Sequence, residues 1–379
     1  MRIDRIDVYH LSVPLRKPIP REPVPFVENF PPLERLETVV VAAHSGDAVG
    51  WGETAPGDLP MHSHEWAAGV FAVLRDILAP RVLGVELESA DDLHKLVEFI
   101  KGHRYAKAAL DFAWWDLRAR KQEKPLYELL KAKRTRIPVG ETFDRFEPVD
   151  DFLAALHQAV ERGAGRLGLK IRPGWDTSML NVVRSELPGV DLHGDVEGAL
   201  RLDHMEILCR MDDFQLRFLE QPLPPEDLVG HAMVQETIAT PVCLDESITT
   251  PETADMALEL HSGRFLNVNP GRLGGLTPAS AVHDAAHEEC TPCYAGANLQ
   301  SPIGLRTIYA LAGKENFCYP ADFYPLDELL PDDLAPPLTV EKNEDGRLEV
   351  VLEQASGIGI CPDLAAIEKY AIQSVTIGG

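Results

Sequence analysis

The stretch between residues 190 and 247 contains three short apolar runs that each reach an acid: VDLHGD (190–195), LRFLEQP (216–222) and PVCLDES (241–247). The acids are evenly spaced, since 220 − 195 = 25 and 245 − 220 = 25 residues. Segments with helical periodicity fill the intervals between the runs. An apolar strand, a crossover helix and two turns fit one such interval, so the stretch predicts successive parallel strands.

Similar runs extend this pattern in both directions along the chain. The others are RIPVGE (136–141), RLGLKI (166–171), RFLNVNP (264–270), TPCYAG (291–296) and NFCYPAD (316–322). Eight strands that alternate with helices over units of near-constant length favour a closed barrel over an open doubly wound sheet. We therefore predict an α/β fold, with a (β/α)-barrel catalytic domain at residues 131–325.

The flanking segments predict a second, smaller α+β unit at residues 1–130. Strand-like runs at 2–13 and 36–54 surround a proline-rich loop at 18–32, and helical periodicity follows at 64–83 and 90–128. After the barrel, residues 326–379 predict a segment that returns to this unit. A turn around Glu344–Gly346 predicts a hairpin, which we expect to pack on the N-terminal unit.

The even spacing has a chemical consequence. One βα unit returns the chain to the same height one strand further round a barrel, so Asp195, Glu220 and Asp245 are expected side by side at its catalytic face. Three uncompensated carboxylates would repel one another strongly, and a divalent cation resolves that conflict. Oxygen ligands indicate a hard ion, Mg²⁺ before Mn²⁺ or Ca²⁺. The alternative is that these acids pair with arginines or cap helices.

Lys170 ends the preceding run, one unit before Asp195 (195 − 170 = 25 residues), and no other lysine occurs between Lys133 and Lys314. A lysine near a metal and out of bulk water is expected to have its pKa lowered to about 7–8, which suits a general base. Its alternative is a salt bridge to Glu197 or to the metal carboxylates. Together the parts predict removal of a proton next to a substrate carboxylate, with the developing charge stabilised by the cation.

The composition limits the kinds of molecule that the protein is expected to bind. A formal net charge of −24 argues against nucleic acid and anionic membranes. The N-terminal residues contain no apolar run long enough for a signal peptide or a membrane span, and six scattered cysteines fit free thiols. We therefore expect a cytoplasmic protein that acts on a small-molecule carboxylate.

Several motifs resemble a known family. The segments LKIRPGWD (169–176) and NPGRLGG (269–275), the strand ends EQPL and CLDES, and KGHRYAKAALDFAWWDL (101–117) resemble the muconate-lactonizing branch of the enolase superfamily, and within it the o-succinylbenzoate synthase/N-acylamino acid racemase enzymes. The resemblance covers most of the chain. It implies a capping domain on a modified (β/α)₇β barrel, Mg²⁺ held by Asp195, Glu220 and Asp245, Lys170 as base, and a homo-oligomer.

The resemblance also assigns residues around the substrate. Cap loops at 20–30, which include Phe26, and at 53–65 would shape the pocket. This chain departs from the pattern at four places: Gly168 replaces a lysine, Glu197 an asparagine, Asn269 a second catalytic lysine, and Gln300 an acid that relatives often carry. We expect Asn269 to be a catalytic residue together with Lys170, and we expect substrate contacts from Glu197, Gln300, Phe26 and Tyr294, the last on the seventh strand.

The presence of Asn269 in place of the second catalytic lysine favours elimination over racemisation. Racemisation needs an acid or base on each face of the substrate, whereas syn elimination of water needs only one, and asparagine does not shuttle protons near neutral pH. We therefore predict a dehydratase-type lyase. A racemase, epimerase or cycloisomerase, with Tyr294 or a water in place of the lysine, is one alternative. A barrel that binds a metal and a carboxylate without turnover is the other.

Overall fold

The computed structural model describes residues 1–21, 31–61, 63–144 and 147–379. Its N-terminal part is an antiparallel sheet in the order β14-β1-β2-β3. The strands are β1 (Arg5–Ile19), β2 (Leu33–Ser45), β3 (Ala48–Thr54) and β14 (Ala371–Gly378). The centre of the sheet is buried on both faces, as successive apolar residues of β2 show. Val39 and Val41 pack with the N-terminal helices, and Val40 packs with the main core of the barrel.

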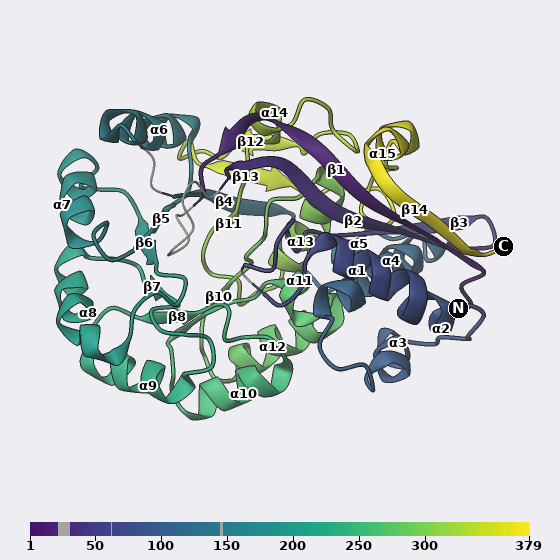
Figure 1. The fold of residues 1–379 in the computed structure, drawn as a ribbon, viewed down its shortest axis with the longest axis horizontal. Helices are drawn as coiled ribbons and strands as arrows, with labels where there is room; N and C mark the ends of the chain where they lie inside the picture. Colours follow the sequence, from purple (N-terminus) through teal and green to yellow (C-terminus); the bar gives the residue numbers. More distant parts are fainter. Residues whose placement is uncertain (22–30, 62, 145–146) are drawn as a thin grey trace.

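Helices cover one face of this sheet and reach the barrel. They are α1 (Ala67–Val73), the π-helix η1 (Leu74–Leu78), α2 (Ala79–Val82), α3 (Ala90–Val97), α4 (Arg104–Lys121) and α5 (Leu126–Leu129). Almost every residue of α4 from Tyr105 to Ala119 is buried, because this helix lies between the sheet and the barrel (Figure 1). The N-terminal unit is thereby fastened along one side of the barrel.

The eight predicted strands all form, and every neighbouring pair except β10 and β11 forms a parallel ladder. They are β4 (Arg136–Phe143), β5 (Leu167–Lys170), β6 (Leu192–Asp195), β7 (Leu219–Glu220), β8 (Val242–Leu244), β9 (Phe265–Asn267), β10 (Cys293–Tyr294) and β11 (Ala321–Asp322). β11 pairs with β4. Between β10 and β11 the ladder is not continuous: an isolated bridge joins Cys293 to Phe317, and the amide of Asp322 donates to the carbonyl of Ala295.

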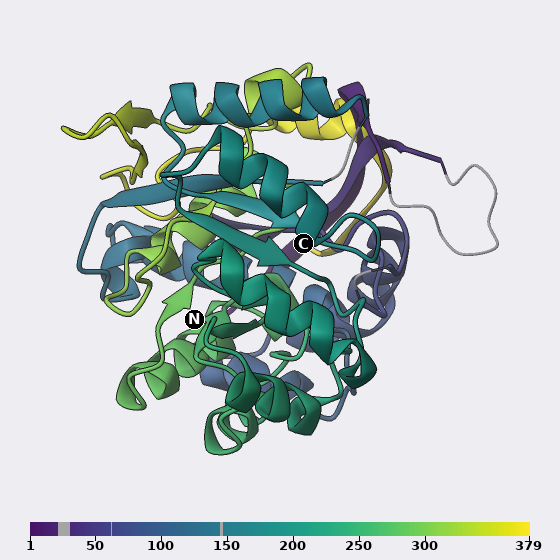
Figure 2. The ribbon, with the colours of Figure 1, turned by 90° about the vertical axis from the view of Figure 1, so that its left-hand side faces the viewer.

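Helices follow the first seven of these strands, which gives the (β/α)₇β order. They are α6 (Val149–Arg162), α7 (Thr177–Glu186), α8 (Met205–Met211) with the short 3₁₀ helices η2 (Leu202–His204) and η3 (Asp212–Phe214), α9 (Leu228–Thr237), α10 (Pro251–Glu259), α11 (Pro270–Leu273) with α12 (Leu276–Glu288), and α13 (Pro302–Ala312). Figure 2 shows the earlier helices side by side over the outer face of the strands.

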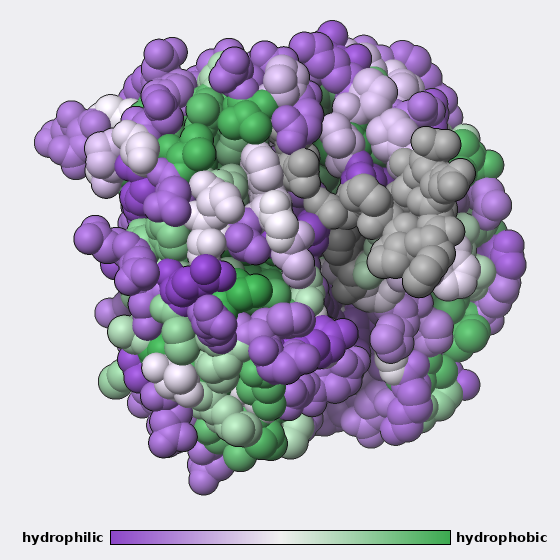
Figure 3. All heavy atoms as spheres, turned by 60° about the vertical axis from the view of Figure 1, so that its left-hand side comes forward, coloured by the Kyte–Doolittle hydropathy of each residue, from purple (hydrophilic) through white to green (hydrophobic). Residues whose placement is uncertain are grey.

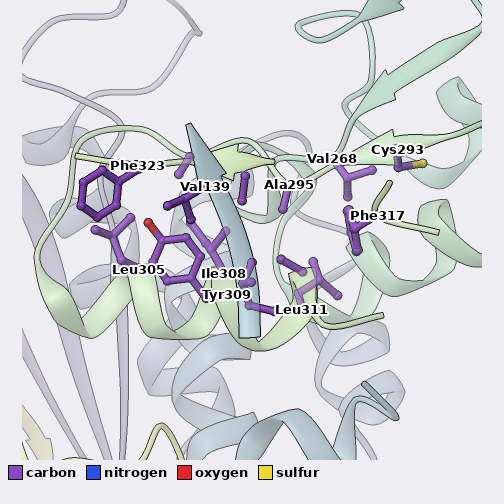
Figure 4. Close-up of a cluster of buried hydrophobic side chains, with 14 of the residues drawn as sticks. Val139, Val268, Cys293, Ala295, Leu305, Ile308, Tyr309, Leu311, Phe317 and Phe323 are labelled. Carbon is purple, nitrogen blue, oxygen red and sulfur yellow. The ribbon is translucent and has the colours of Figure 1, made fainter. Parts of the chain in front are cut away.

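The last barrel helix shows how the interior is filled. Every residue of α13 is buried, and its apolar side chains belong to one core with Val139 of β4, with Val268 directly after β9 and with Phe317 before β11 (Figure 4). At about 25 cal/mol per Å² of apolar surface, burial of this kind is the main source of barrel stability. α13 therefore forms a buried apolar layer against the strands, whereas the barrel centre also holds polar side chains such as Arg166 and His193.

The C-terminal residues differ in part from the prediction. The hairpin forms, with β12 (Val340–Lys342) and β13 (Leu348–Val351), but β13 pairs with β4 of the barrel and not with the N-terminal unit. The expected placement was wrong because the open edge at the start of β4 offers unpaired backbone groups that the hairpin satisfies. α14 (Leu326–Leu329) and α15 (Leu364–Tyr370) lie on either side of it in sequence, and β14 then joins β1.

The surface agrees with the acidic composition. The face drawn in Figure 3 is mostly hydrophilic. In the described parts of the chain, no helix combines the length and the apolar character that a bilayer crossing requires. The six cysteines are all free.

Candidate active site

The predicted acids lie together at the carboxyl ends of adjacent strands. Lys170, Asp195 and Glu220 are the last residues of β5, β6 and β7, and the register pairs Lys170 with Asp195 and Asp195 with Glu220. Asp245 follows the last residue of β8, Leu244. The prediction that equal spacing places these groups at neighbouring strand ends is confirmed.

The three carboxyls influence one another electrostatically. Burial is the largest effect on each and raises the pKa of all three, to about 7 for Asp195. Repulsion from Asp195 and Asp245 adds to burial at Glu220, whose pKa is raised well above its usual range. Such a group of desolvated, mutually repelling acids is unfavourable unless positive charge compensates it.

In this structure two side chains provide that charge. Lys170 forms an ion pair with Glu197 and lies 3.8 Å from Oδ2 of Asp195. Arg272, in α11, forms an ion pair with Oδ1 of Asp245. Among the described residues, no group of three or more acid, histidine or cysteine side chains has the geometry to hold a metal ion.

The donor set nevertheless fits a hard divalent cation. Its oxygens come from three adjacent strand ends and repel one another, which a dication would relieve. Nearby, Oε2 of Glu246 is buried without a hydrogen-bond partner among the described residues, and so are Oδ1 of Asn267 and Nε of Arg272. Unpaired buried polar atoms of this kind are rare, and the water shell of a bound cation offers such atoms partners.

Glu220 is supported from inside the barrel. Its Oε1 accepts a 2.5 Å hydrogen bond from the hydroxyl of Tyr294 and a 2.8 Å hydrogen bond from the amide of Asn267. His193 Nε2 lies 3.5 Å from Oε2. Burial, and then Arg166, lowers the pKa of His193 well below its usual range, so the imidazole is neutral. The Tyr294 hydroxyl thus donates a hydrogen bond to Glu220. Because this hydroxyl is already engaged, Tyr294 is a poor proton donor for a substrate.

Lys170 belongs to a chain of charges at the end of β5. Glu197, which it contacts, also accepts from Arg172 at 2.7 Å, and Arg172 lies 3.3 Å from Asp144. Burial lowers the pKa of Lys170, but Glu197 and Asp195 outweigh that effect, so the pKa is raised. The predicted lowering of this pKa is therefore wrong for the chain by itself, because the carboxylates hold the ammonium form.

The remaining predicted residues lie in different surroundings. Asn269, at the end of the sixth strand, is 6% exposed and accepts hydrogen bonds from the amides of Gly271 and Arg272. Gln300 is 4% exposed, and its Oε1 lies where a β-carbon on Gly304 would stand, so it packs against the first turn of α13. Phe26 lies outside the described residues.

The sequence reasoning missed two cations of this site. Arg272 and Arg172 follow strands β9 and β5 and were not distinguished from the many other arginines. The available signal was position: each comes two or three residues after a polar group at a strand end, Arg172 after Lys170 and Arg272 after Asn269. In a barrel such residues stay close to the catalytic face.

Comparisons with known proteins place this site in a family. Residues 12–131 match the mandelate racemase/muconate lactonizing enzyme N-terminal domain, and residues 151–366 match the enolase C-terminal domain-like family. The chain is 33% identical to the o-succinylbenzoate synthase of Geobacillus stearothermophilus over 371 residues, covering 98% of this chain and 96% of that one. It is 32% identical to the N-succinylamino acid racemase of Thermus thermophilus over 373 residues, 98% of each chain.

A solved structure supports the same assignment. An unknown member of the enolase superfamily from Enterococcus faecalis superposes with a TM-score of 0.88 at 29% identity and covers 99% of both chains. The chain therefore belongs to the enolase superfamily, in the mandelate racemase/muconate lactonizing enzyme family. It is an enzyme of the lyase or isomerase type.

Proposed function

We propose that this enzyme removes the proton next to a substrate carboxylate and expels a hydroxyl group from the neighbouring carbon, as a dehydratase of the o-succinylbenzoate synthase type. One observation carries this choice. Lys170 stands at the end of the second strand of the barrel, whereas the sixth strand ends near Asn269, whose side chain caps α11. Among the described residues, these two strand ends thus offer one proton-transferring group, whereas racemisation needs two.

We assign Asp195, Glu220 and Asp245 as the ligands of Mg²⁺, with Mn²⁺ as a substitute. When bound, the ion would stabilise negative charge that develops on the substrate carboxylate. Tyr294 and Asn267 hold the Glu220 carboxylate in place through their hydrogen bonds to Oε1. Asp195 and Asp245 must turn from Lys170 and Arg272 to reach a common ion.

Lys170 has two roles in the proposed elimination. Its neutral amine takes the α-proton, the resulting ammonium returns a proton to the departing hydroxyl on the same face, and water leaves as the carbon–carbon double bond forms. The pKa of Lys170 is raised by Glu197 and Asp195. A cation bound by Asp195 would offset the effect of that carboxylate on the pKa of Lys170, whereas the effect of Glu197 would stay.

Racemisation or epimerisation is the second candidate, because relatives at 31–32% identity are N-succinylamino acid racemases. The side-chain hydrogen bonds of Asn269 and Tyr294 argue against racemisation, because they leave neither residue able to transfer a proton on the side of the substrate away from Lys170. The proposed substrate is a small-molecule carboxylate in either case. A homo-oligomeric state and a cytoplasmic location stay predictions.

The experiment uses two probes with Mg²⁺ in D₂O: the hydroxylated precursor that yields o-succinylbenzoate on loss of water, and an N-succinyl-L-amino acid. NMR follows loss of the α-proton signal and formation of the unsaturated product. In the Lys170→Met variant, the rates of α-proton exchange and of product formation are both expected to fall by at least about 100-fold. Lys314→Met is the matched control, because Lys314 is 8% exposed and pairs with Asp284 away from the strand ends. Retained turnover in Lys170→Met would falsify the assignment.

A further inference from the structure

The barrel places β5 and β9 on opposite sides. They are the second and the sixth of its eight strands, so three strands lie between them in either direction. A substrate held between Lys170 and the end of β9 therefore has Asn269 on the side away from the base. The contacts of the Asn269 side chain therefore determine which chemical groups are available on the side of the site opposite Lys170.

The Asn269 side chain is engaged at both of its polar atoms. Oδ1 accepts from the amides of Gly271 at 3.1 Å and Arg272 at 3.3 Å, so the residue caps the N-terminus of α11. Nδ2 donates to Oδ1 of Asn298 at 3.2 Å. A lysine has no acceptor atom and could not form this cap.

Asn298 continues the connection to the N-terminal unit. Its Nδ2 donates to the carbonyl of Ala55 at 2.7 Å, directly after β3, and to the hydroxyl of Tyr105 in α4 at 3.2 Å. Ala55 and Tyr105 are 5% and 4% exposed. Two amide side chains thus join the ends of the sixth and seventh strands to two elements of the N-terminal unit.

The packing around these amides is close. A β-carbon on Gly271 would lie 2.9 Å from Cε1 of Tyr105. The absence of a side chain at residue 271 therefore lets α11 approach α4, and the hydrogen bonds of Asn269 and Asn298 lie beside this contact. Asn269 and Tyr105 are buried and Asn298 is half-buried, so these hydrogen bonds lie in surroundings of lower polarity than bulk water, where each contributes more.

We propose that Asn269 and Asn298 form an amide latch that fastens the N-terminal unit to the barrel, and that Asn269 is a positioning residue rather than a proton carrier. The latch holds the segment after β3 in place at the side of the site opposite Lys170. This inference rests on the proposed function only in taking that side as the one that faces substrate.

The test compares Asn269→Ser, which retains a helix-capping oxygen but cannot reach Asn298, with Asn298→Ala. Hydrogen–deuterium exchange of the intact protein reports on the peptide that follows β3 and on the start of α4. Loss of the latch is expected to speed exchange there on the order of fivefold, the effect of one hydrogen bond. Asn316→Ser is the matched control: Asn316 is 8% exposed and donates to Thr291 at the far end of β10.

A second readout follows α-proton exchange of an N-succinyl-L-amino acid in D₂O. Both latch variants are expected to need about fivefold more probe for half-saturation while the rate at saturation changes less than about twofold. Asn298→Ala also removes the hydrogen bonds to Ala55 and Tyr105, so its effect should be at least as large as that of Asn269→Ser. The double variant should behave like Asn298→Ala, because the bond between the two amides is already lost in that single variant.

Two results would overturn the latch. The first is unchanged amide exchange after β3 in both variants. The second is loss of saturated α-proton exchange in Asn269→Ser with normal amide exchange, which would make Asn269 part of the chemistry. If the wild-type chain does not act on the probe, the proposed function fails for that substrate, whereas the amide-exchange comparison still decides the latch.

Discussion

The imidazole of His193 lies 2.6 Å from the point where a β-carbon on residue 168 would stand, and the Thr142 hydroxyl lies 2.5 Å from it. Gly168 and His193 are paired on adjacent strands. His193 is 1% exposed and stacks on Phe218, with ring centroids 4.7 Å apart. The second strand therefore has no room for a side chain at this position, because the third strand already fills the space.

Replacing this glycine should thus be costly. Gly168→Ala is expected to lower the free energy of unfolding by about 1–3 kcal/mol, since an added methyl group must displace a packed imidazole. Urea unfolding followed by circular dichroism measures the change. Gly189→Ala is the control, because no described atom lies within 4 Å of its added β-carbon. Equal losses in the two variants would show that the close approach to His193 is not the cause.

Metal binding should stabilise the protein. Mg²⁺ at 100 times its dissociation constant is expected to raise the free energy of unfolding by about 2.7 kcal/mol, and EDTA should reverse the gain. Asp245→Asn should remove most of it, because one ligand is lost. Asp191→Asn should retain it, since Asp191 pairs with Arg217 away from the three strand ends. A Mg²⁺ response that Asp245→Asn leaves intact would contradict the ligand assignment.

Glu53 should be a large contributor to the contact between β3 and α13. Its fully buried carboxylate accepts from the amides of Ser301 at 3.0 Å and Gly304 at 2.9 Å, and from the hydroxyl of Thr38 at 2.9 Å. Glu53→Ala leaves these donors unpaired, so we expect a loss of about 3 kcal/mol in thermal or urea unfolding. Glu34→Ala, an exposed acid on β2, should change stability by less than about 0.5 kcal/mol.

Stability should fall in mild acid because of buried neutral histidines. Burial lowers the pKa of His231 below 6.5, and its Nε2 accepts from the amide of Leu223 at 3.2 Å, which a second ring proton would prevent. The unfolded chain binds this proton below about pH 6.5 and the folded chain does not, so stability is full above that pH and declines below it. His231→Gln should show a shallower decline in urea midpoints between pH 6.5 and 5; an unchanged slope would exclude His231 as a source.

The chain should act on one face of its substrate only. With separate samples of N-succinyl-L- and N-succinyl-D-amino acids in D₂O, we expect α-deuterium to enter one enantiomer without formation of the other. The reason is that Lys170 is the single proton carrier between β5 and β9 in our assignment. Chiral chromatography with mass spectrometry measures both. Inversion of either enantiomer at a rate comparable to exchange would establish a racemase.

The repeating pattern of the barrel could be predicted because it depends on local sequence. A buried parallel strand needs a short apolar run, and the crossover helix fixes the interval, so Lys170, Asp195 and Glu220 could be placed at adjacent strand ends from their spacing alone. Asp245 lies one residue beyond its strand and is still beside the other acids, because a single residue is too short to carry the chain away from the catalytic face.

The partners of these residues could not be predicted in the same way. The ion pair of Arg272 with Asp245 joins groups 27 residues apart, and its formation depends on how α11 is oriented by α4. The placement of the hairpin against β4 depends on which strand edge is left open. Such choices follow from packing between distant segments, which a single sequence does not encode in any local pattern.

The pairing of Asp245 with Arg272, and of Lys170 with Glu197 and Asp195, also bears on the order of assembly. A zinc finger stays unfolded until its ion arrives, since nothing else holds its ligands together. Here Lys170 and Arg272 already offset the charge of these carboxylates, so folding of the barrel would not depend on the proposed ion. In our assignment the ion would compete with an ammonium and a guanidinium for the same oxygens, and its binding would be a reversible replacement of one set of cations by another.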